Sequence, residues 1–584
     1  MCSPTAVRVV FSLTLAAFCL APTPLRAQAR PVTQPAPHPG ASLPDAVSGE
    51  QAIARLGAEL PQLATRHGMS ADELRSELRG DPTLWLKGSD TLLFVDRPAP
   101  PPGPSDAPSY SGSIPTSQAF LLHTDPDSKK VIYLDFNGHH SHGNGWAHNI
   151  HFPAWNSSGS SASFSESELR SIIAHWEYVA EDFAPWDVDV TTEAPPIDDI
   201  LGGFMGDDRY GVRVVMTQVT SGFGSGSGGI AVLGSYGSIK DTPVFVFNKG
   251  DNTGSMSASH EVGHAMHLLH DGLNGSTYHP GTGSGATSWG PIMGAPFGKT
   301  VVQWSSGDYP GSSTSQLDLY VIGGAPTNLY PDDAGDSLAE ASPLAGACPD
   351  VSARSVDGVI GWFTDVDAWS FETSGGFISI TANPHTPGPN LDIELALYDG
   401  TGALLEIDQP GNATHAAIAR NLPAGSYVVT IDGVGKSGVY SDYGSLGQYT
   451  LSVDAPAVGA FTDLGNGLAG SGGLVPVLSG TGLPCEGNLV TTTLDSALPN
   501  SSAWLVYGFS QLNVFFKGGT MVPDFGAGGD FLPVAVGAAG SVSLPSSWPA
   551  AVPAGVQLVL QYWVQDAAGP AGFSASNGLE LLTP

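Results

Sequence analysis

HEVGHAMHLLHD, residues 260–271, is the stretch on which the interpretation of the whole chain depends. On a helix, His260 and His264 are four residues apart and share one face, so both imidazoles can reach one cation. Glu261 lies beside them, within reach of a water at that cation. Three neutral nitrogen ligands leave Zn²⁺ an open position, where the pKa of water falls to roughly 7. A carboxylate can then accept the proton while the water attacks a carbonyl.

Two later histidines compete for the place of the third ligand. On one straight helix, His267 would lie about 10.5 Å along the axis from His260, at a rise of 1.5 Å per residue. That span leaves little room for three nitrogens at about 2.0–2.1 Å from one zinc ion. We therefore predict that the helix ends near His267, that the chain turns there, and that His270 is the third ligand.

This motif resembles that of the metzincin metallopeptidases, H-E-x-x-H-x-x-G-x-x-H followed by a family-marking residue. Asp271 in the last place is similar to the reprolysin/adamalysin-like branch, and PIMG at residues 291–294 resembles the Met-turn of these proteins. The resemblance spans residues 120–335 and implies a zinc-dependent endopeptidase that acts on a protein or peptide substrate. It implies the following roles: Glu261 as catalytic base, His260, His264 and His270 as metal ligands, and Met293 as the structural Met-turn residue.

The chain departs from the metzincin pattern at His267, where the family has glycine. That glycine adopts a left-handed conformation, which costs a non-glycine residue on the order of 1–2 kcal/mol. Histidine is among the residues found more often at positive φ, so we expect a strained but intact site. Ala295 stands two residues after Met293, so we expect no fifth, tyrosine ligand of the astacin or serralysin kind.

Composition narrows the class of protein. The chain has 584 residues, with 75 Gly, 47 Pro and only 13% charged residues. This balance predicts about three or four domains built from short strands and turns rather than from long charged helices. The net charge of −34 would repel phosphate backbones, so we exclude nucleic acid as a partner. The oligomeric state stays open.

The first residues favour export from the cell. An apolar run from Val9 to Ala21 is too short to span a bilayer, and Ala27-Gln28-Ala29 is a small-x-small cleavage signal. We expect residues 1–29 to be a signal peptide, the mature protein to be secreted, and no transmembrane segment to remain. Cys348 and Cys485 then remain, and a disulfide between them stays open because the sequence does not show their separation.

Shifts in composition divide the rest of the chain. We expect a propeptide with a Pro-rich linker (30–118), a catalytic domain (119–335), a linker (336–352) and two further domains (353–455 and 456–584). Strand and helix patterns alternate in the catalytic domain, where apolar residues at helical spacing predict a helix over residues 166–182. The last two segments show strands and no helix of useful length. The expected fold class is multidomain α+β, with a metzincin-like α/β catalytic domain followed by two all-β, sandwich-like domains.

The segment before the catalytic domain predicts helices of its own. Apolar residues recur at helical spacing over residues 50–67, where Pro61 marks a kink or break. A second helix is expected over residues 70–79, with Glu73 completing a capping box at its start.

A Pro/Gly/Ser linker, residues 97–118, follows this helical segment. In a secreted hydrolase this arrangement predicts a propeptide that keeps the precursor latent. The segment holds no cysteine that could bind zinc, whereas a carboxylate could bind it. Asp81 resembles the aspartate of some astacin-type propeptides, and a helix-ending aspartate before Pro82 is the simpler interpretation.

Residues 353–455 resemble the bacterial pre-peptidase C-terminal domain, which accompanies secreted peptidases. The matching motifs are Asp365-Val366-Asp367, Asn390-Leu391-Asp392-Ile393, LPAGSY at 422–427 and Gly447-Gln448-Tyr449. Asp365, Asp367 and Asp392 fit a Ca²⁺ site, because carboxylates near turns suit a hard cation. They fit turn-forming aspartates at the edge of a sandwich equally well.

Five further histidines lie within thirteen residues: His139, His140, His142, His148 and His151. They could bind another metal or line a substrate cleft. Their Gly/Ser/Asn context fixes no geometry and favours a polar loop with solvated imidazoles.

Two other functions are alternatives to a secreted zinc endopeptidase made as a zymogen. An exported, non-catalytic binding protein with a decayed metzincin-like domain would explain His267 but not the intact Glu261. A zinc hydrolase of the gluzincin kind would take its third ligand from a later helix, and no helical ExxxD segment follows at suitable spacing.

Overall fold

The structure is a computed structural model of the chain. It describes residues 43, 45–100, 112–141, 146, 150–157, 163–202, 208–219, 223–224, 226–324, 328–344, 352–457, 460–526, 528–553 and 555–583. The predicted signal peptide, half of the Pro-rich linker (residues 101–111), His142, His148 and Cys348 lie outside these residues, so those predictions are untested.

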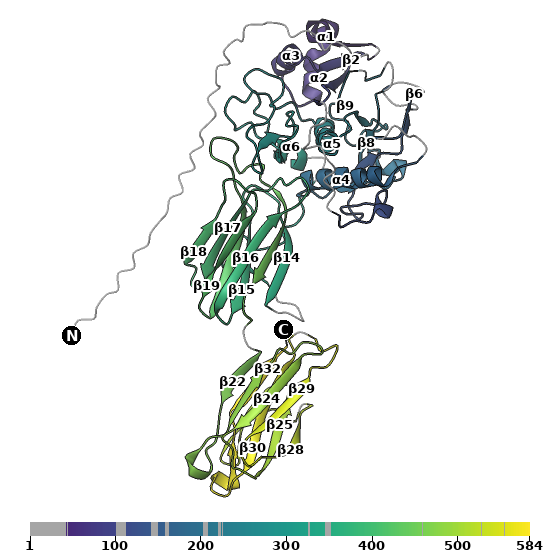
Figure 1. The fold of residues 1–584 in the computed structure, drawn as a ribbon. Helices are drawn as coiled ribbons and strands as arrows, with labels where there is room; N and C mark the ends of the chain where they lie inside the picture. The colour runs from purple at the N-terminus through teal and green to yellow at the C-terminus, as the bar shows by residue number, and fades with distance from the viewer. Residues whose placement is uncertain are drawn as a thin grey trace, which may run out of the picture. The chain divides into compact units, whose positions relative to one another are not determined.

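The expected fold class, an α+β protein with a metzincin-like α/β catalytic domain, is wrong. Strands account for 38% of the described residues and helices for 16%, and the strands form many separate sheets (Figure 1). The reason is that Gly, Ser and Pro dominate the stretches between strands, and these residues favour turns over helices. Within the described part of 119–335, the α-helices are α4 (Glu166–Asp182), α5 (Asp251–Ala265) and α6 (Asp318–Gly324). No described helix is long and apolar enough to cross a membrane.

An eight-stranded sheet organises the first half of the chain, in the order β1-β2-β3-β9-β10-β8-β4-β7. Strands β4, β7, β8 and β10 run parallel, whereas β9 is antiparallel to β10. The strands are β1 (Ala46–Ser48), β2 (Leu84–Lys87), β3 (Thr91–Asp96), β4 (Lys130–Asp135), β7 (Asp189–Thr191), β8 (Tyr210–Met216), β9 (Gly229–Val232) and β10 (Val244–Val246). Two small pairs stand apart from it: β5 (His139–Ser141) with β6 (Ile150–Phe152), and β11 (Trp289–Pro291) with β12 (Val301–Gln303).

Two helices pack together beside this sheet. Helix α4 has the predicted bounds and begins with a capping box between Ser165 and Glu168. Helix α5 is buried along its whole length and contacts α4, β8, β9 and β10. Because α5 has no exposed face, packing on all sides holds it. Its C-terminal half, which carries His260 and His264, therefore lies inside the protein.

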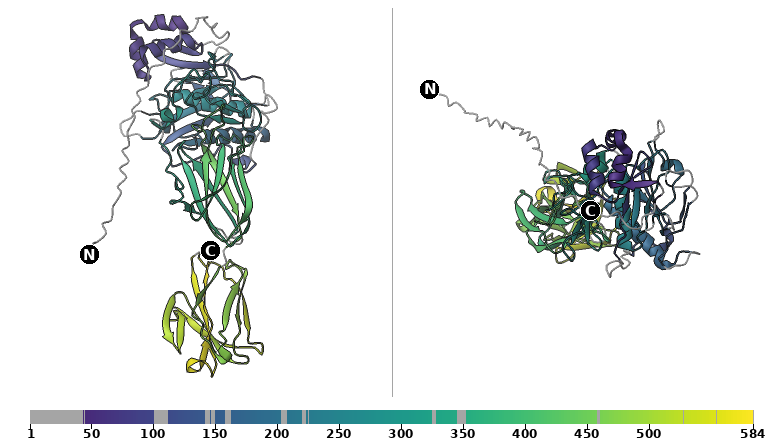
Figure 2. Two further views of the ribbon diagram at one scale, coloured as in Figure 1. Left: turned by 90° about the vertical axis from the view of Figure 1, so that its left-hand side faces the viewer. Right: turned by 90° about the horizontal axis from the view of Figure 1, so that it is seen from above.

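The N-terminal segment adds three strands to the same sheet. Strand β3 pairs antiparallel with β9, from Leu93 opposite Val232 to Asp96 opposite Gly229. Three helices pack with these strands around a small core, drawn in purple in Figures 1 and 2: α1 (Gly49–Leu56), α2 (Leu60–Arg66) and α3 (Ala71–Gly80).

The helices of this segment follow the predicted pattern with one shift. The capping box between Ser70 and Glu73 is present. The break in the first helix falls at Gly57, which has a positive φ of 48°, rather than at Pro61. Pro61 lies in the first turn of α2, where a missing amide hydrogen costs nothing.

Two facing sheets follow, in the orders β13-β15-β20-β17-β18 and β14-β21-β16-β19, drawn in green in Figure 2. The strands are β13 (Ser342–Pro343), β14 (Ala353–Ile360), β15 (Val366–Thr373), β16 (Gly376–Pro384), β17 (Ile393–Asp399), β18 (Leu404–Asp408), β19 (Ala416–Leu422), β20 (Gly425–Gly433) and β21 (Gly447–Asp454). One hydrophobic core runs from residues 119–344 into these sheets. At the junction, Asn390 Nδ2 donates to Asp182 Oδ1 at 2.8 Å.

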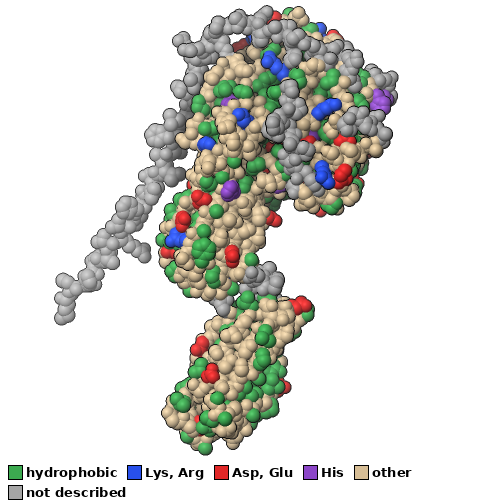
Figure 3. All heavy atoms as spheres, viewed as in Figure 1, with side chains coloured by type: hydrophobic (Ala, Val, Ile, Leu, Met, Phe, Trp, Pro, Cys, Tyr) green, Lys and Arg blue, Asp and Glu red, His purple; other side chains and the backbone are tan. Residues whose placement is uncertain are grey.

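The last segment is also all β in its described residues. Its strands are β22 (Phe461–Gly465), β23 (Val477–Thr481), β24 (Leu489–Asp495), β25 (Ser502–Gly508), β26 (Gln511–Phe516), β27 (Gly519–Pro523), β28 (Asp530–Ala535), β29 (Val542–Ser547), β30 (Gln557–Gln565), β31 (Phe573–Ala575) and β32 (Gly578–Leu582). Large apolar side chains are exposed on this segment, Phe515 most of all at 84% (Figure 3).

Candidate metal centre

Helix α5 presents the first two predicted ligands. The rings of His260 and His264 are buried, and their centroids are 4.7 Å apart. The helix ends at Ala265, and the amide of Leu268 donates to the carbonyl of Gly263 at 2.9 Å. This C-terminal cap turns the chain away from the helix axis.

His267 makes that turn with a φ of 77°, so the left-handed turn residue predicted here is confirmed. Gly234 leaves room for its ring, because a Cβ on Gly234 would lie 2.1 Å from His267 Cε1. The His267 ring lies 5.4 Å from that of His67, in the N-terminal segment. His267 is not part of the buried group of potential metal ligands that the described residues form.

After the turn, His270 returns to the other two imidazoles. Its ring centroid lies 4.7 Å from that of His264 and 5.2 Å from that of His260. The Nε2 atoms of His264 and His270 are 3.1 Å apart. Two nitrogens bound tetrahedrally to one metal at about 2.0–2.1 Å would be about 3.3 Å apart. The spacing of the three predicted ligands therefore suits one ion.

The second nitrogen of each imidazole is hydrogen-bonded, which fixes the ring. Each Nδ1 donates to an oxygen 2.6–2.8 Å away: His260 to the carbonyl of Ile292, His264 to the carbonyl of Leu268 and His270 to the carboxylate of Asp81. An imidazole that donates from Nδ1 directs the lone pair of Nε2 at a metal. The three residues thus meet the chemical requirement for holding a metal ion.

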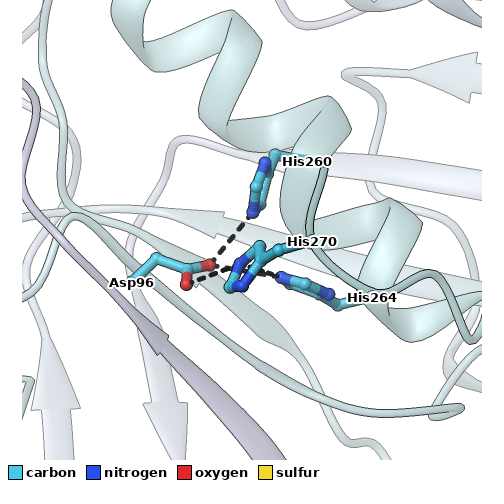
Figure 4. A group of neighbouring side chains, drawn as sticks. All are labelled: Asp96, His260, His264 and His270. Carbon is cyan, nitrogen blue, oxygen red and sulfur yellow. Dashed lines mark hydrogen bonds and ion pairs between the residues drawn. The ribbon is translucent and has the colours of Figure 1, made fainter. Parts of the chain in front are cut away.

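A carboxylate from the N-terminal segment faces the three imidazoles (Figure 4). The oxygens of Asp96, the last residue of β3, lie 3.2 Å from His260 Nε2, 3.3 Å from His264 Nε2 and 3.1 Å from His270 Nε2. These four residues form a buried group that could hold a metal ion. Because ligands of one ion have this spacing, Asp96 lies where a fourth ligand would be.

Asp81, the aspartate of the N-terminal segment that resembles a propeptide ligand, has a different place. Asp81 lies behind His270, where one oxygen accepts from Nδ1 and the other accepts from the amide of Thr83 at 2.8 Å. One feature of the sequence could have pointed to Asp96 as a ligand: it is a carboxylate at the end of a strand, directly before the Pro-rich linker. The pairing of β3 with β9, which brings Asp96 to the histidines, has no local signature.

Burial and neighbouring charges set the protonation of this group. Burial, followed by the charge of Asp96, raises the pKa of Glu261 well above its usual value. Burial lowers the pKa of His264 to about 4. Burial also acts to lower the pKa of His270, but the carboxylates of Asp81 and Asp96 outweigh it and raise that pKa to about 10. Without a cation, a proton on His270 supplies the positive charge that the carboxylates require.

Glu261 borders a cavity of about 270 Å³ beside the cluster, together with Asp96 and Tyr278. The hydroxyl of Tyr278 donates to Asp96 Oδ1 at 2.8 Å, a contact that the sequence did not suggest. A Cβ on Gly229 would lie 1.9 Å from Glu261 Oε1, so glycine at this place in β9 makes room for the carboxylate.

Met293 packs against α5 at Gly263. Its side chain is fully buried, and its Sδ lies 2.5 Å from the point that a Cβ on Gly263 would occupy. Its carbonyl accepts from the amide of Asp271 at 2.8 Å, while the preceding carbonyl, of Ile292, accepts from His260. The stretch 291–294 therefore supports both ends of the cluster.

The other candidate residues lie elsewhere. His139 and His140 are on β5 and His151 is on β6, and the metal-ligand groups found among the described residues include none of them. Asp365 and Asp367 join an acidic group with residues 332–336. Asp392 does not join that group, and its Oδ2 accepts from the hydroxyl of Tyr440 at 2.6 Å.

No family profile and no curated protein matches the chain. Solved structures match parts of it. The pre-peptidase C-terminal domain of a collagenase from Bacillus anthracis is 17% identical over 22% of this chain and 99% of that one, with a TM-score of 0.15. A tetra-tandem repeat in the extending region of a large adhesion protein is 14% identical over 39% and 50% of the two chains, with a TM-score of 0.13. A DUF3823 family protein from Bacteroides uniformis is 11% identical over 33% and 89%, with a TM-score of 0.13. At these TM-scores the likenesses carry no argument about function.

Proposed function

We propose that the protein is a secreted, zinc-dependent endopeptidase that is made as a latent precursor. The observation that supports this most directly is the convergence of three Nε2 atoms on the Asp96 carboxylate, at 3.1–3.3 Å, with Glu261 beside them. Three imidazoles favour zinc over calcium or magnesium, which prefer oxygen ligands. The apolar N-terminal run and the acidic composition support secretion.

The roles of the residues follow from their positions. A zinc ion held by the three histidines would lower the pKa of water and polarise a peptide carbonyl. Glu261 would accept the proton of that water and pass it to the leaving amine. The carbonyls of Ile292 and Leu268 hold the rings of His260 and His264, so their Nε2 atoms stay in place. Asp96 keeps water from the same position, which is why we expect the precursor to be latent.

Strand β3 supports a peptide as the substrate. It is an extended segment, paired antiparallel with β9, whose last residue brings an oxygen to the imidazoles. Because β9 pairs with β10 on its other side, removal of β3 would leave one open edge on β9. Such an edge binds an extended chain through main-chain hydrogen bonds. A substrate that paired as β3 does would bring a peptide carbonyl to the place of the Asp96 carboxylate.

The alternative of a non-catalytic binding protein rested on His267. The turn at His267 is accommodated beside Gly234, and the three imidazoles and Glu261 remain together. No contact among the described residues favours the alternative.

The test compares zinc content and casein hydrolysis of the cleaved protein with those of Glu261→Gln, each with and without a chelator. We expect wild-type hydrolysis to need zinc. Glu261→Gln should keep zinc and lose about 10²–10⁴-fold in rate, the usual contribution of a general base. Glu193→Gln, which alters an exposed carboxylate of the same part of the chain, should match the wild type. Wild-type turnover by Glu261→Gln, or hydrolysis that survives the loss of zinc, would refute the proposal.

A further inference from the structure

A second group of carboxylates lies far along the chain from the histidine cluster. A cavity of about 850 Å³ is walled by residues 329–336, parts of β14 and β21, and residues 361–365. None of its lining residues is Lys or Arg. Asp332, Asp333, Asp336 and Asp365 line the cavity, and a carboxylate oxygen of Asp367 lies within 4.8 Å of ligand atoms of Asp332 and Asp333.

Asp367 distinguishes this group from an ordinary acidic surface. Its side chain, on β15, is 0% exposed, and its Oδ2 accepts from the hydroxyl of Tyr449 at 2.5 Å. Its Oδ1 is buried and has no hydrogen-bond partner among the described residues. One carboxylate oxygen each of Asp332, Asp333 and Asp367 lie within 4.8 Å of one another. A buried acceptor without a partner costs on the order of 1–3 kcal/mol, and a cation would remove that cost.

Asp365 extends the group on the same side. Its Oδ2 accepts from the amide of Gly361 at 2.6 Å, and its Oδ1 is a second buried oxygen without a partner in the described structure. Asp365 forms a triplet with Asp332 and Asp336 in which ligand atoms lie within 4.8 Å of one another. Because Asp332 belongs to both triplets, the five carboxylates surround one region.

We propose that these five aspartates form a calcium site that joins residues 332–336 to β15. All the donors are oxygens, which suit Ca²⁺ with its six to eight oxygen ligands, whereas zinc favours nitrogen and sulfur. Magnesium demands near-ideal octahedral geometry, which carboxylates from two separate segments do not readily supply. Calcium sites of extracellular modules have a Kd of about 10⁻⁴–10⁻³ M, and we expect this range here. The site does not depend on the proposed hydrolase activity.

The charges of the group support a bound cation. Burial, followed by the charges of Asp333, Asp365 and Asp332, raises the pKa of Asp367 to about 8. Burial likewise raises the pKa of Asp365 to about 6. Calcium must therefore displace protons, and its affinity should rise between pH 6 and pH 8. The other titratable groups at the cavity are Tyr330, Asp336, Asp357, His385 and Tyr449.

The test titrates the full chain, loaded with zinc, with Ca²⁺ by calorimetry and with Tb³⁺ by luminescence. Trp362 lines the cavity, so Tb³⁺ bound there should be excited through the indole and displaced by Ca²⁺. We expect Asp367→Asn and Asp332→Asn each to weaken Ca²⁺ binding at least tenfold. Asp332 is exposed, so its variant tests the site without a risk to folding. The matched control is Asp392→Asn, which alters a buried aspartate directly before β17 and should bind Ca²⁺ as the wild type does.

Thermal unfolding provides a second readout. Calcium should raise the Tm of the wild type and leave the Tm of Asp367→Asn nearly unchanged, since only the native state binds the ion. A wild-type chain that binds no Ca²⁺ at ten times the expected Kd would overturn the proposal, as would variants with wild-type affinity. Zinc content should stay the same in every variant, so failure of this site is distinguishable from failure of the proposed hydrolase.

Discussion

Asp96 is the residue on which latency would depend, because among the described residues its carboxylate is the one that contacts all three imidazoles. We predict that Asp96→Ala raises peptide hydrolysis by the uncleaved precursor about 10²-fold, since buried paired charges commonly contribute 2–5 kcal/mol. The measurement is the initial rate on a fluorogenic peptide, with gel analysis to show that the linker is intact. Asp90→Asn, on the exposed turn of the same hairpin, is the control. An Asp96→Ala precursor as inactive as the wild type would show that another contact imposes latency.

We predict opposite effects on zinc content for substitutions of His270 and His267, the two histidines after α5. His270→Ala should lose zinc, because it removes one of three convergent Nε2 atoms. His267→Gly should keep zinc and activity, and in the cleaved protein it should gain about 1 kcal/mol in the free energy of unfolding from relief of the left-handed turn. In the precursor the lost contact with His67 offsets part of this gain. Metal analysis measures the zinc content of each variant, and thermal unfolding measures its stability. If His267→Gly lost zinc while His270→Ala kept it, His267 and not His270 would be the third ligand.

Residues could be predicted where a local rule applied. The spacing of His260 and His264 and the span to His267 led to His270 as the third residue, and the structure brings these three together. Asp96 and Tyr278 could not be found in this way, because they reach the cluster through a strand pairing between distant segments.

At the scale of elements, the end of α4 is tied to β21 by a buried carboxyl. Gln448 donates to Glu181 from its amide at 3.1 Å and from Nε2 at 3.0 Å, but burial outweighs these bonds and raises the pKa of Glu181 to about 8. An acid whose pKa is raised in the folded state stabilises the protein below its unfolded pKa and loses that contribution as pH rises through the folded value.

We therefore predict that the free energy of unfolding falls by on the order of 2 kcal/mol between pH 5 and pH 9. A pKa shift contributes about 1.36 kcal/mol per unit, and we expect only part of this contribution to be realised. Glu181→Gln should flatten this slope, because glutamine carries no proton to lose. Glu166→Gln, at the exposed start of the same helix, should keep it. Denaturant unfolding at the two pH values measures the difference, and equal slopes in all three proteins would contradict the prediction.

Helices and strands with a clear hydrophobic period could be predicted from the sequence, whereas the pairing of the strands into sheets could not. Helix α4 was found at its observed bounds, because apolar residues recur along it and Ser165 caps it. Helix α5 is buried on every face, so it has no amphipathic pattern and only the histidine motif marked it. The fold class was wrong because short strands such as β7 and β10 take up few residues, while the Gly-rich stretches around them form turns. Which strands would share one sheet depends on contacts that no local pattern records.

At the scale of the whole molecule, the two proposed metal sites lie in different parts of the chain. The histidine cluster combines β3, α5 and the turn after it, whereas the acidic group combines residues 332–336 with β15. Their donor sets favour different cations, so we expect a chelator selective for calcium to leave zinc bound.

Because β1 to β3 and β9 belong to one sheet, activation of the proposed peptidase would depend on the concentration of the protein. Cutting the linker after β3 breaks one covalent bond but none of the hydrogen bonds between β3 and β9. Under the proposed function, the severed segment would act as a separate inhibitor, without the high effective concentration that the linker had supplied. At high protein concentration the N-terminal segment stays bound to the rest of the protein, and at low concentration it dissociates. The proposed peptidase, once cleaved, would thus stay inhibited near the cell that makes it and hydrolyse peptides only after it has been diluted.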